Sequence, residues 1–200
     1  MVAGSKRRKI EDTKPLDLDH LETKLYDMEP RDSCLVALLY LSGRRITEIL
    51  GLKKKDFKIE DKRISFETFN EKVYRKKQTG AFTILIGDRY YERIRPHWRT
   101  DIGTGKRLTI FVAKRLGSLS ELDHLFNAYK HSNHPIGYQM AYKIVRFNFP
   151  DTWPHLYRHE RFTEVAKAYR SDPVAMHRFT FHKRFESTLQ YIRDLEEEKI

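Results

Sequence analysis

The sequence predicts a mainly α-helical fold with a small three-stranded antiparallel sheet (α+β). Most of the chain repeats apolar residues every three or four positions, which is the period of a helix with one buried face. Residues 57–87 instead alternate apolar and polar side chains in places, which is typical of half-buried strands. With 200 residues and 40% hydrophobic content, the chain can form one substantial core.

Three helices are predicted in the first quarter of the chain. A polar and basic segment, residues 1–16, is interpreted as a flexible arm or linker, and the first helix is LDLDHLETKLYDM. Pro30 suits the first turn of a second helix, because that position needs no backbone N–H, and Gly43 suits its end. The third helix is the short segment ITEILGL, residues 46–52.

The strands follow. FKIEDKRISFETF, residues 57–69, is predicted to form a hairpin with a polar turn, and AFTILIG, residues 81–87, is the third strand after a basic turn. Helical periodicity then returns. The remaining helices are expected at residues 88–98, 118–130, 136–147, 154–166 and 186–199.

The chain carries a large excess of positive charge. Lys and Arg number 39 against 28 Asp and Glu, which gives a formal net charge of +11. This excess favours a polyanionic partner, nucleic acid before an anionic membrane, although a basic surface without such a partner is the simpler alternative. No apolar run approaches the ~20 residues of a membrane span. The single cysteine, Cys34, lies in an apolar run, so we expect no disulfide or cysteine-bound zinc, and an intracellular location.

The helix PHLYRHERFTEVA, residues 154–166, combines charge with a buried face. His155, Arg158 and His159 share the face that continues into the apolar residues further along the helix. A buried arginine keeps its proton and is costly unless an anion pairs with it. Either an acidic residue inside the protein or an anion from outside must therefore meet this face.

Shorter motifs give weaker predictions and are set aside. GTGKR, residues 103–107, lacks the first glycine and the Ser/Thr of a phosphate-binding loop. His155 and His159 have a spacing that suits zinc, but Glu160 is misplaced for a metalloprotease. The acidic residues of the predicted hairpin match a magnesium-dependent nuclease only faintly. We therefore expect no metal site.

Further features occur in a fixed order along the chain. SGRRITE places Arg45 where one helix ends and a short one begins, and a basic turn carries Lys76 and Lys77 just before the third strand. His182 lies nine residues before Tyr191, which is on the last amphipathic helix. Taken singly, each has an ordinary explanation as a surface cation, a core histidine or a core aromatic.

Together with the histidine-rich helix, these features resemble the tyrosine recombinase (phage integrase) family over residues 17–200. The resemblance implies the catalytic domain of that family, with the fold that it shares with type IB topoisomerases. SGRRITE then supplies the catalytic arginine, Arg45 rather than Arg44, and Glu48 as its support. The other corresponding positions are Lys77 (with Lys76 as the alternate), His155, Arg158, His159, His182 and the nucleophile Tyr191.

The sequence departs from the family pattern in two places. Phe181 stands where a glycine usually precedes the late histidine, and the basic turn lacks the usual glycine beside its lysine. The family's N-terminal DNA-clamping domain is also missing, which is expected of a catalytic fragment or of a minimal member.

The resemblance implies chemistry at a DNA phosphate. Two arginines would stabilise the charge on the phosphorane, two histidines would donate hydrogen bonds to it, and Tyr191 would form a 3′-phosphotyrosine. Lys77 would protonate the departing 5′ oxygen, and neither a metal nor ATP would be needed. The residues expected to contact the DNA outside the catalytic centre are Arg75, Lys76, Lys183 and Arg184.

The expected function is site-specific recombination or integration on double-stranded DNA. Copies of the chain would associate on DNA through the C-terminal tail after Tyr191, and the protein would be found with DNA in the cytoplasm, nucleoid or nucleus, with no membrane partner. A type IB topoisomerase-like relaxing enzyme and a non-catalytic DNA-binding module on the same scaffold remain alternatives. A metal-dependent nuclease is disfavoured because no convincing carboxylate cluster is present.

Overall fold

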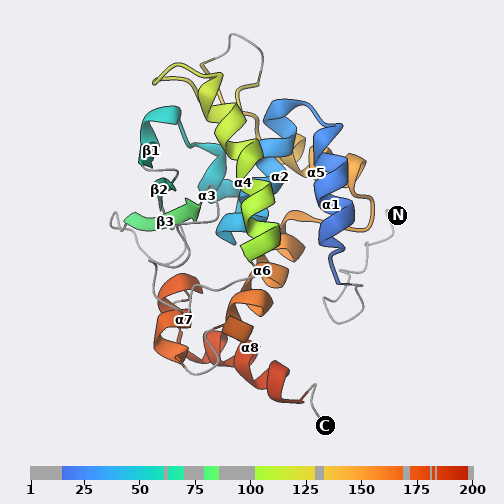
Figure 1. Ribbon diagram of the computed structural model, residues 1–200, viewed down its shortest axis with the longest axis vertical. Helices are drawn as coiled ribbons and strands as arrows, with labels where there is room; N and C mark the ends of the chain where they lie inside the picture. Colours follow the sequence, from blue (N-terminus) through green and yellow to red (C-terminus); the bar gives the residue numbers. More distant parts are fainter. Residues whose placement is uncertain are drawn as a thin grey trace, which may run out of the picture.

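The computed structural model describes residues 15–60, 63–69, 79–85, 102–128, 133–168, 172–180, 182 and 184–197. Most of these residues are helical. Several helices pack around one central helix, and the last two helices lie at the lower end of the view in Figure 1. The elements in chain order are α1 (Leu18–Tyr26), α2 (Pro30–Ser42), α3 (Ile46–Leu50), a 3-10 turn (Lys54–Asp56), β1 (Phe57–Glu60), β2 (Arg63–Phe69), β3 (Thr79–Leu85), α4 (Ile102–Gly117), α5 (Tyr138–Asn148), α6 (Pro154–Ala168), α7 (Pro173–Thr180) and α8 (Glu186–Glu197).

Helix α2 is the centre of the core. Every residue from 33 to 42 is buried, which is what a helix with apolar side chains around most of its circumference requires. α2 packs against α4 on one side and against α6 on another. As expected from the sequence, Pro30 begins the helix and Gly43 ends it in the left-handed conformation, with φ of 59°.

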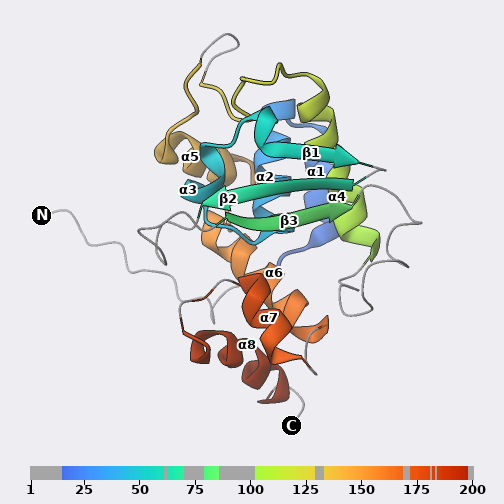
Figure 2. The same ribbon diagram turned by 90° about the vertical axis from the view of Figure 1, so that its left-hand side faces the viewer.

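The strands form one sheet in the order β1-β2-β3, with antiparallel neighbours. It lies across the side of the helices that faces the viewer in Figure 2, above the segment that contains α7 and α8. Phe57 lies opposite Phe66 in the β1–β2 register, and their stacked rings are 4.9 Å apart between centroids. These two aromatic side chains join the sheet to the core.

The prediction of a helix at residues 118–130 is wrong. Residues 118–128 form turns and isolated bridges, because their backbone groups bond to another segment of the chain. Lys54 N–H donates to the Asp123 carbonyl, and Leu125 N–H donates to the Leu52 carbonyl. The Asp123 carboxylate also accepts a hydrogen bond from Ser120 N–H, a local turn contact that competes with helix formation.

Two helices were not predicted. The first turns of α4 contain GTGKR, where two glycines weaken the helical signal. The buried residues of α4 at positions 108, 111, 112 and 116 nevertheless follow the helical period, and α4 packs on α2. α7 spans only eight residues, which gives little periodicity to detect. The helix expected at 88–98 and residues 1–14 of the expected arm lie outside the described residues. Within the described residues, no helix is long and apolar enough to cross a membrane.

The conformation of Gly43 gives a stability prediction. Gly43→Ala should lower the free energy of unfolding by about 1–3 kcal/mol, because a residue with a Cβ is strained at positive φ. The new Cβ would also lie 2.8 Å from Phe162 Cε1. Urea unfolding followed by circular dichroism measures the change.

Gly51→Ala is the matched control. Gly51 has φ of −79°, and an added Cβ there meets no atom within 4 Å. This variant should keep the wild-type stability or gain up to about 1 kcal/mol. Equal losses in the two variants would show that the left-handed conformation of Gly43 is not the cause.

Candidate active site

Arg45 and Glu48 form a fixed pair at the start of α3. The backbone N–H of Arg45 donates to Glu48 Oε2 at 3.0 Å, and Arg45 Nη1 donates to Oε1 at 2.8 Å. The Glu48 side chain is fully buried, whereas a quarter of the Arg45 side chain is exposed. The buried carboxylate therefore holds the guanidinium in one orientation at the protein surface.

Arg158 on α6 is buried and is held by backbone carbonyls. Its Nη1 donates to the Gly43 carbonyl at 2.5 Å and its Nη2 to the Thr180 carbonyl at 3.2 Å. The guanidinium carbon lies 4.2 Å from the centroid of the Phe162 ring. Burial, followed by the charge of Arg45, lowers the pKa of Arg158 to about 10, so it stays protonated at neutral pH. A guanidinium has five N–H groups, so these two bonds leave further donors for a ligand.

A third arginine, Arg44, lies beside the first two. It is buried, and burial lowers its pKa to about 9, while Glu48 opposes this shift. Within SGRRITE, the sequence analysis chose Arg45 rather than Arg44 as the catalytic arginine. The only sequence feature that pointed to Arg44 was its place next to Arg45. The structure brings both arginines and Arg158 to the same place.

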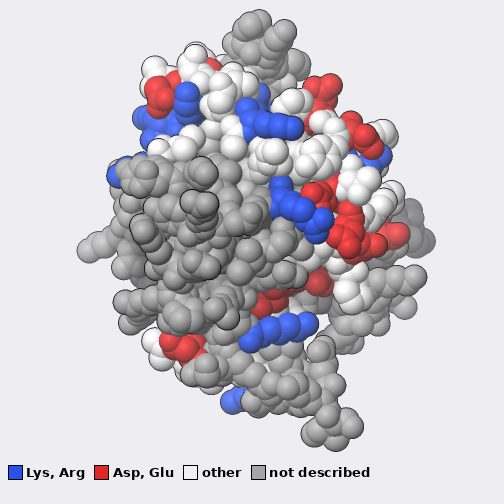
Figure 3. Space-filling view, viewed as in Figure 1, with Lys and Arg blue, Asp and Glu red and all other residues white. Residues whose placement is uncertain are grey.

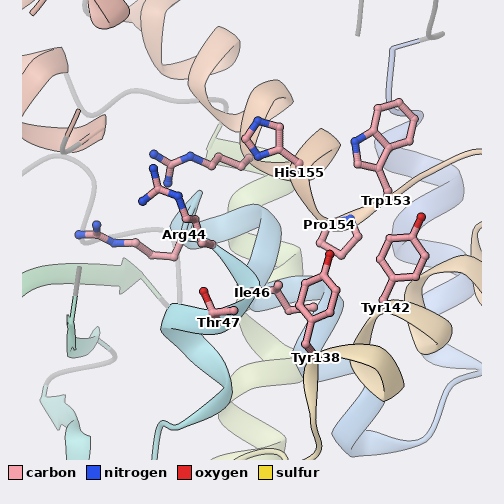
Figure 4. Close-up of a pocket in the computed structure, with 10 residues that line it drawn as sticks. Arg44, Ile46, Thr47, Tyr138, Tyr142, Trp153, Pro154 and His155 are labelled. Carbon is pink, nitrogen blue, oxygen red and sulfur yellow. The ribbon is translucent and has the colours of Figure 1, made fainter. Parts of the chain in front are cut away.

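These arginines line an open pocket of about 360 Å³. Figure 4 shows arginine side chains and His155 on one side of this pocket, and Tyr138, Tyr142, Trp153 and Pro154 on the other. The rings of the two tyrosines stack with centroids 6.1 Å apart. The pocket thus combines a cationic wall, which suits a phosphate, with an aromatic wall, which suits the flat face of a base. The aromatic wall was missed, although the spacing of GYQMAY places two tyrosines on one helix face.

Phe162 organises a cluster of aromatic side chains around Tyr191. The Phe162 ring lies 5.6 Å from Tyr191 and 5.3 Å from His182, in edge-to-face geometry. Tyr191 is also 5.3 Å from the ring of His159 and 6.0 Å from His182. Since Phe162 also packs on Arg158, the cluster places the candidate nucleophile beside the buried arginine.

The environment of His182 keeps its imidazole neutral. Burial, followed by the positive charges of Arg158 and Arg45, lowers the pKa of His182 from 6.5 to about 4. His182 Nδ1 lies 3.2 Å from the hydroxyl of Thr188. Sequence reasoning did not single out Thr188.

The predicted DNA-contacting residues fall mostly outside the described part of the chain. Arg75, Lys76 and Lys183 are not described, and Arg184 is exposed. Lys77, the predicted general acid, also lies outside the described residues. Residues 70–78 join Phe69 to Thr79, which lie opposite each other in the β2–β3 register. The described ends of β2 and β3 on either side of this segment are therefore adjacent.

The described surface seen in Figure 3 carries both signs of charge. Acidic side chains gather over α1, and Arg107 of α4 pairs with Asp19 and Glu22 there. The excess of positive charge is therefore offset on this face where the structure describes it. Among the described residues, no group of three His, Cys, Asp or Glu side chains is arranged to bind a metal.

Comparison with known proteins gives the family. The sequence matches the phage integrase family over residues 16–198. The chain belongs to this family. Its members are DNA strand-transferring enzymes, so the expected enzyme class and the mainly helical tyrosine recombinase fold are confirmed.

Relatives and solved structures agree with this assignment. The type 1 fimbriae regulatory protein FimE of Escherichia coli K12 is 26% identical over 175 residues, which cover 80% of this chain and 73% of FimE. FimE of Shigella flexneri gives the same values. The site-specific recombinase XerH, bound to its difH substrate before cleavage, has a TM-score of 0.61 at 18% identity, with 94% of this chain and 52% of XerH covered. XerA recombinase has a TM-score of 0.57 at 16% identity, with 93% of this chain and 63% of XerA covered. These structures show a shared fold, and the chain spans about half the length of XerH.

The lowered pKa of His182 predicts a pH dependence of stability. The folded protein binds a proton at His182 less readily than the unfolded chain does, because the pKa falls from 6.5 to about 4. The contribution of the neutral His182 to the free energy of unfolding should therefore be complete above pH 6.5. It should be lost progressively as the pH drops from 6.5 to about 4. Urea unfolding at a series of pH values measures this slope.

His182→Gln removes the titrating group and should reduce the slope in that interval. Other groups, including the carboxylates, still titrate in both proteins, so the difference between the two curves isolates His182. Identical slopes for the wild type and the variant would show that the histidine is not held neutral.

Proposed function

We propose that this chain is a site-specific recombinase that cleaves and rejoins DNA through a covalent 3′-phosphotyrosine, without a metal ion or ATP. The observation that carries the proposal is the meeting of Arg45, Arg158 and His155 at one pocket. His182 and Tyr191 pack on the ring of Phe162, which also contacts the Arg158 guanidinium. The difH complex of XerH, a protein of the same fold, supports DNA as the substrate.

The arginines provide the electrostatic part of the mechanism. When the Tyr191 oxygen forms its bond to phosphorus, a pentavalent phosphorane develops extra negative charge on its non-bridging oxygens. Planar guanidinium groups match pairs of such oxygens with two parallel hydrogen bonds. Arg45 and Arg158 are already oriented, by a carboxylate and by two carbonyls, so little reorganisation accompanies the reaction.

The remaining residues move protons. His155 is exposed at the pocket and would accept the phenolic proton as Tyr191 attacks. His182 would donate a hydrogen bond to a phosphate oxygen. Lys77 would give its proton to the 5′ oxygen as the phosphorus–oxygen bond breaks. The phosphotyrosine keeps the energy of the broken backbone bond, so a 5′ hydroxyl can reverse the step without ATP.

Double-stranded DNA is the proposed partner, with Arg75, Lys76, Lys183 and Arg184 on its backbone. Exchange between two duplexes also requires copies of the chain to meet. We infer that they associate on DNA through the end of α8 and the residues after it. Sedimentation of the chain with and without duplex DNA measures this association, and a strictly monomeric complex on DNA would contradict it.

The first test concerns the nucleophile. Wild-type protein, incubated in EDTA with a nicked duplex that traps the product, should form a covalent protein–DNA adduct that shifts on a denaturing gel. Tyr191→Phe should abolish the adduct and keep DNA binding, because only the attacking oxygen is lost. Tyr26→Phe is a matched control, because Tyr26 is an exposed tyrosine on α1, and this variant should form the adduct normally.

Two results would contradict this assignment. An adduct that persists in Tyr191→Phe would show that another residue is the nucleophile. An adduct that requires added magnesium would show that the arginines do not replace a metal ion.

The second test concerns the general acid. Lys77→Ala should slow cleavage by about 10²–10⁴, the usual cost of losing a general acid. A substrate with sulfur in place of the bridging 5′ oxygen needs no acid, because a thiolate leaves unaided. This substrate should restore cleavage to Lys77→Ala but not to Arg45→Ala or Arg158→Ala, which lack charge stabilisation.

The same substrate separates the two lysines of the basic turn. Rescue of Lys76→Ala in place of Lys77→Ala would move the acid by one residue. If neither variant is rescued, the acid lies elsewhere, and the two histidines are tested next.

A further inference from the structure

Thr188 lies at the centre of a buried polar network between α7 and α8. Its hydroxyl oxygen lies 2.9 Å from His177 Nδ1, 3.0 Å from Thr180 Oγ1 and 3.2 Å from His182 Nδ1. Thr188 and Thr180 are fully buried, so water does not compete for these contacts. The network therefore joins His182 to the helix that carries Tyr191, one turn before that residue.

The number of protons limits the arrangements that this network can adopt. A hydroxyl has one proton and two lone pairs. Thr188 can donate to one of its three neighbours and must accept from the other two. If it donates to His182 Nδ1, a neutral His182 carries its proton on Nε2. If it donates to His177 or Thr180, His182 must carry its proton on Nδ1, and its Nε2 is then a bare lone pair.

The state of His182 decides which arrangement suits the proposed reaction. Arg158, Arg45, His177 and His155 all oppose a positive charge on His182, and burial adds to this, so its pKa falls to about 4. A neutral imidazole donates from only one nitrogen. A bare Nε2 would face the negative phosphate oxygens with its lone pair, whereas Nε2–H would donate to them.

We propose that Thr188 is a positioning residue whose hydroxyl donates to His182 Nδ1 and thereby holds the Nε2–H tautomer that binds the scissile phosphate. The phosphate part of this inference rests on the proposed function. Thr188 then accepts hydrogen bonds from His177 Nδ1–H and from the Thr180 hydroxyl, whose single proton goes to Thr188 at 3.0 Å in place of the His177 carbonyl at 3.3 Å. In this arrangement all three contacts of the Thr188 hydroxyl are hydrogen bonds, one donated and two accepted.

The tautomer can be measured directly. Nitrogen NMR of the full chain, labelled with ¹⁵N-histidine, distinguishes a protonated from a bare Nε2, and His182→Gln identifies the signals of His182. We expect the Nε2–H signature in the wild type at neutral pH. A wild-type His182 with its proton on Nδ1 would overturn the proposal without the need for any variant.

Variants then separate positioning from packing. Thr188→Val keeps the shape and removes the hydroxyl, so it should lose the Nε2–H preference and slow adduct formation about tenfold. Thr188→Ser keeps the hydroxyl and should restore both. Thr180→Val is the matched control, because it removes another buried hydroxyl that contacts Thr188, and it should keep the Nε2–H signature.

The remaining outcomes are also decisive. A Thr188→Val variant with the wild-type tautomer and rate would overturn the proposal. If Thr188→Val does not fold, the tautomer of His182 in the wild type and in Thr188→Ser still tests the proposal. An Nε2–H signature in a wild-type chain that forms no adduct would support the proton assignment while overturning the proposed function.

Discussion

The buried guanidinium of Arg158 is the interaction on which the rest of the site depends. It joins three elements, because it projects from α6 and donates to the carbonyl that ends α2 and to the carbonyl that ends α7. A buried cation whose hydrogen bonds go to backbone carbonyls is costly, because carbonyl dipoles offset this cost less than a directly paired carboxylate would. The fold therefore maintains a concentrated positive charge that an arriving anion can neutralise.

The conformation of Gly43 links this charge to the other arginines. The left-handed turn at the end of α2 directs the Gly43 carbonyl to Arg158, and the two residues that follow are Arg44 and Arg45. The same turn lies so close to Phe162 that a side chain at position 43 would collide with its ring. Phe162 in turn contacts Arg158, His182 and Tyr191. One glycine thus allows the cationic pocket and the aromatic cluster to lie side by side.

The sequence predicts the parts of this site that have local signals. Pro30 and Gly43 mark the ends of α2 because their backbone preferences are local. The order and spacing of the motifs carry a resemblance to the tyrosine recombinase family, and that resemblance gives Arg45, Arg158, His182 and Tyr191 as candidates. The Arg158–Gly43 hydrogen bond spans 115 positions, and no local pattern encodes it. Contacts between distant parts of the chain also explain why the helix predicted at 118–130 does not form. Backbone groups of this segment bond to residues near position 53. The role of Thr188 as a shared contact likewise appears only when α7 and α8 are packed together.

The two arginines at the pocket are therefore not equivalent. Arg45 is partly exposed and pairs with a glutamate within its own short helix, so its loss removes charge from the pocket and leaves the connections between helices in place. Arg158 carries the same charge but also ties α6 to the ends of α2 and α7. Removing it leaves two buried carbonyls without this donor, one of them at the end of α7, the helix that contributes to the His182 network. In the proposed mechanism, a loss of activity at position 45 thus reports on charge stabilisation, whereas a loss at position 158 combines charge stabilisation with the positions of the helices around Tyr191.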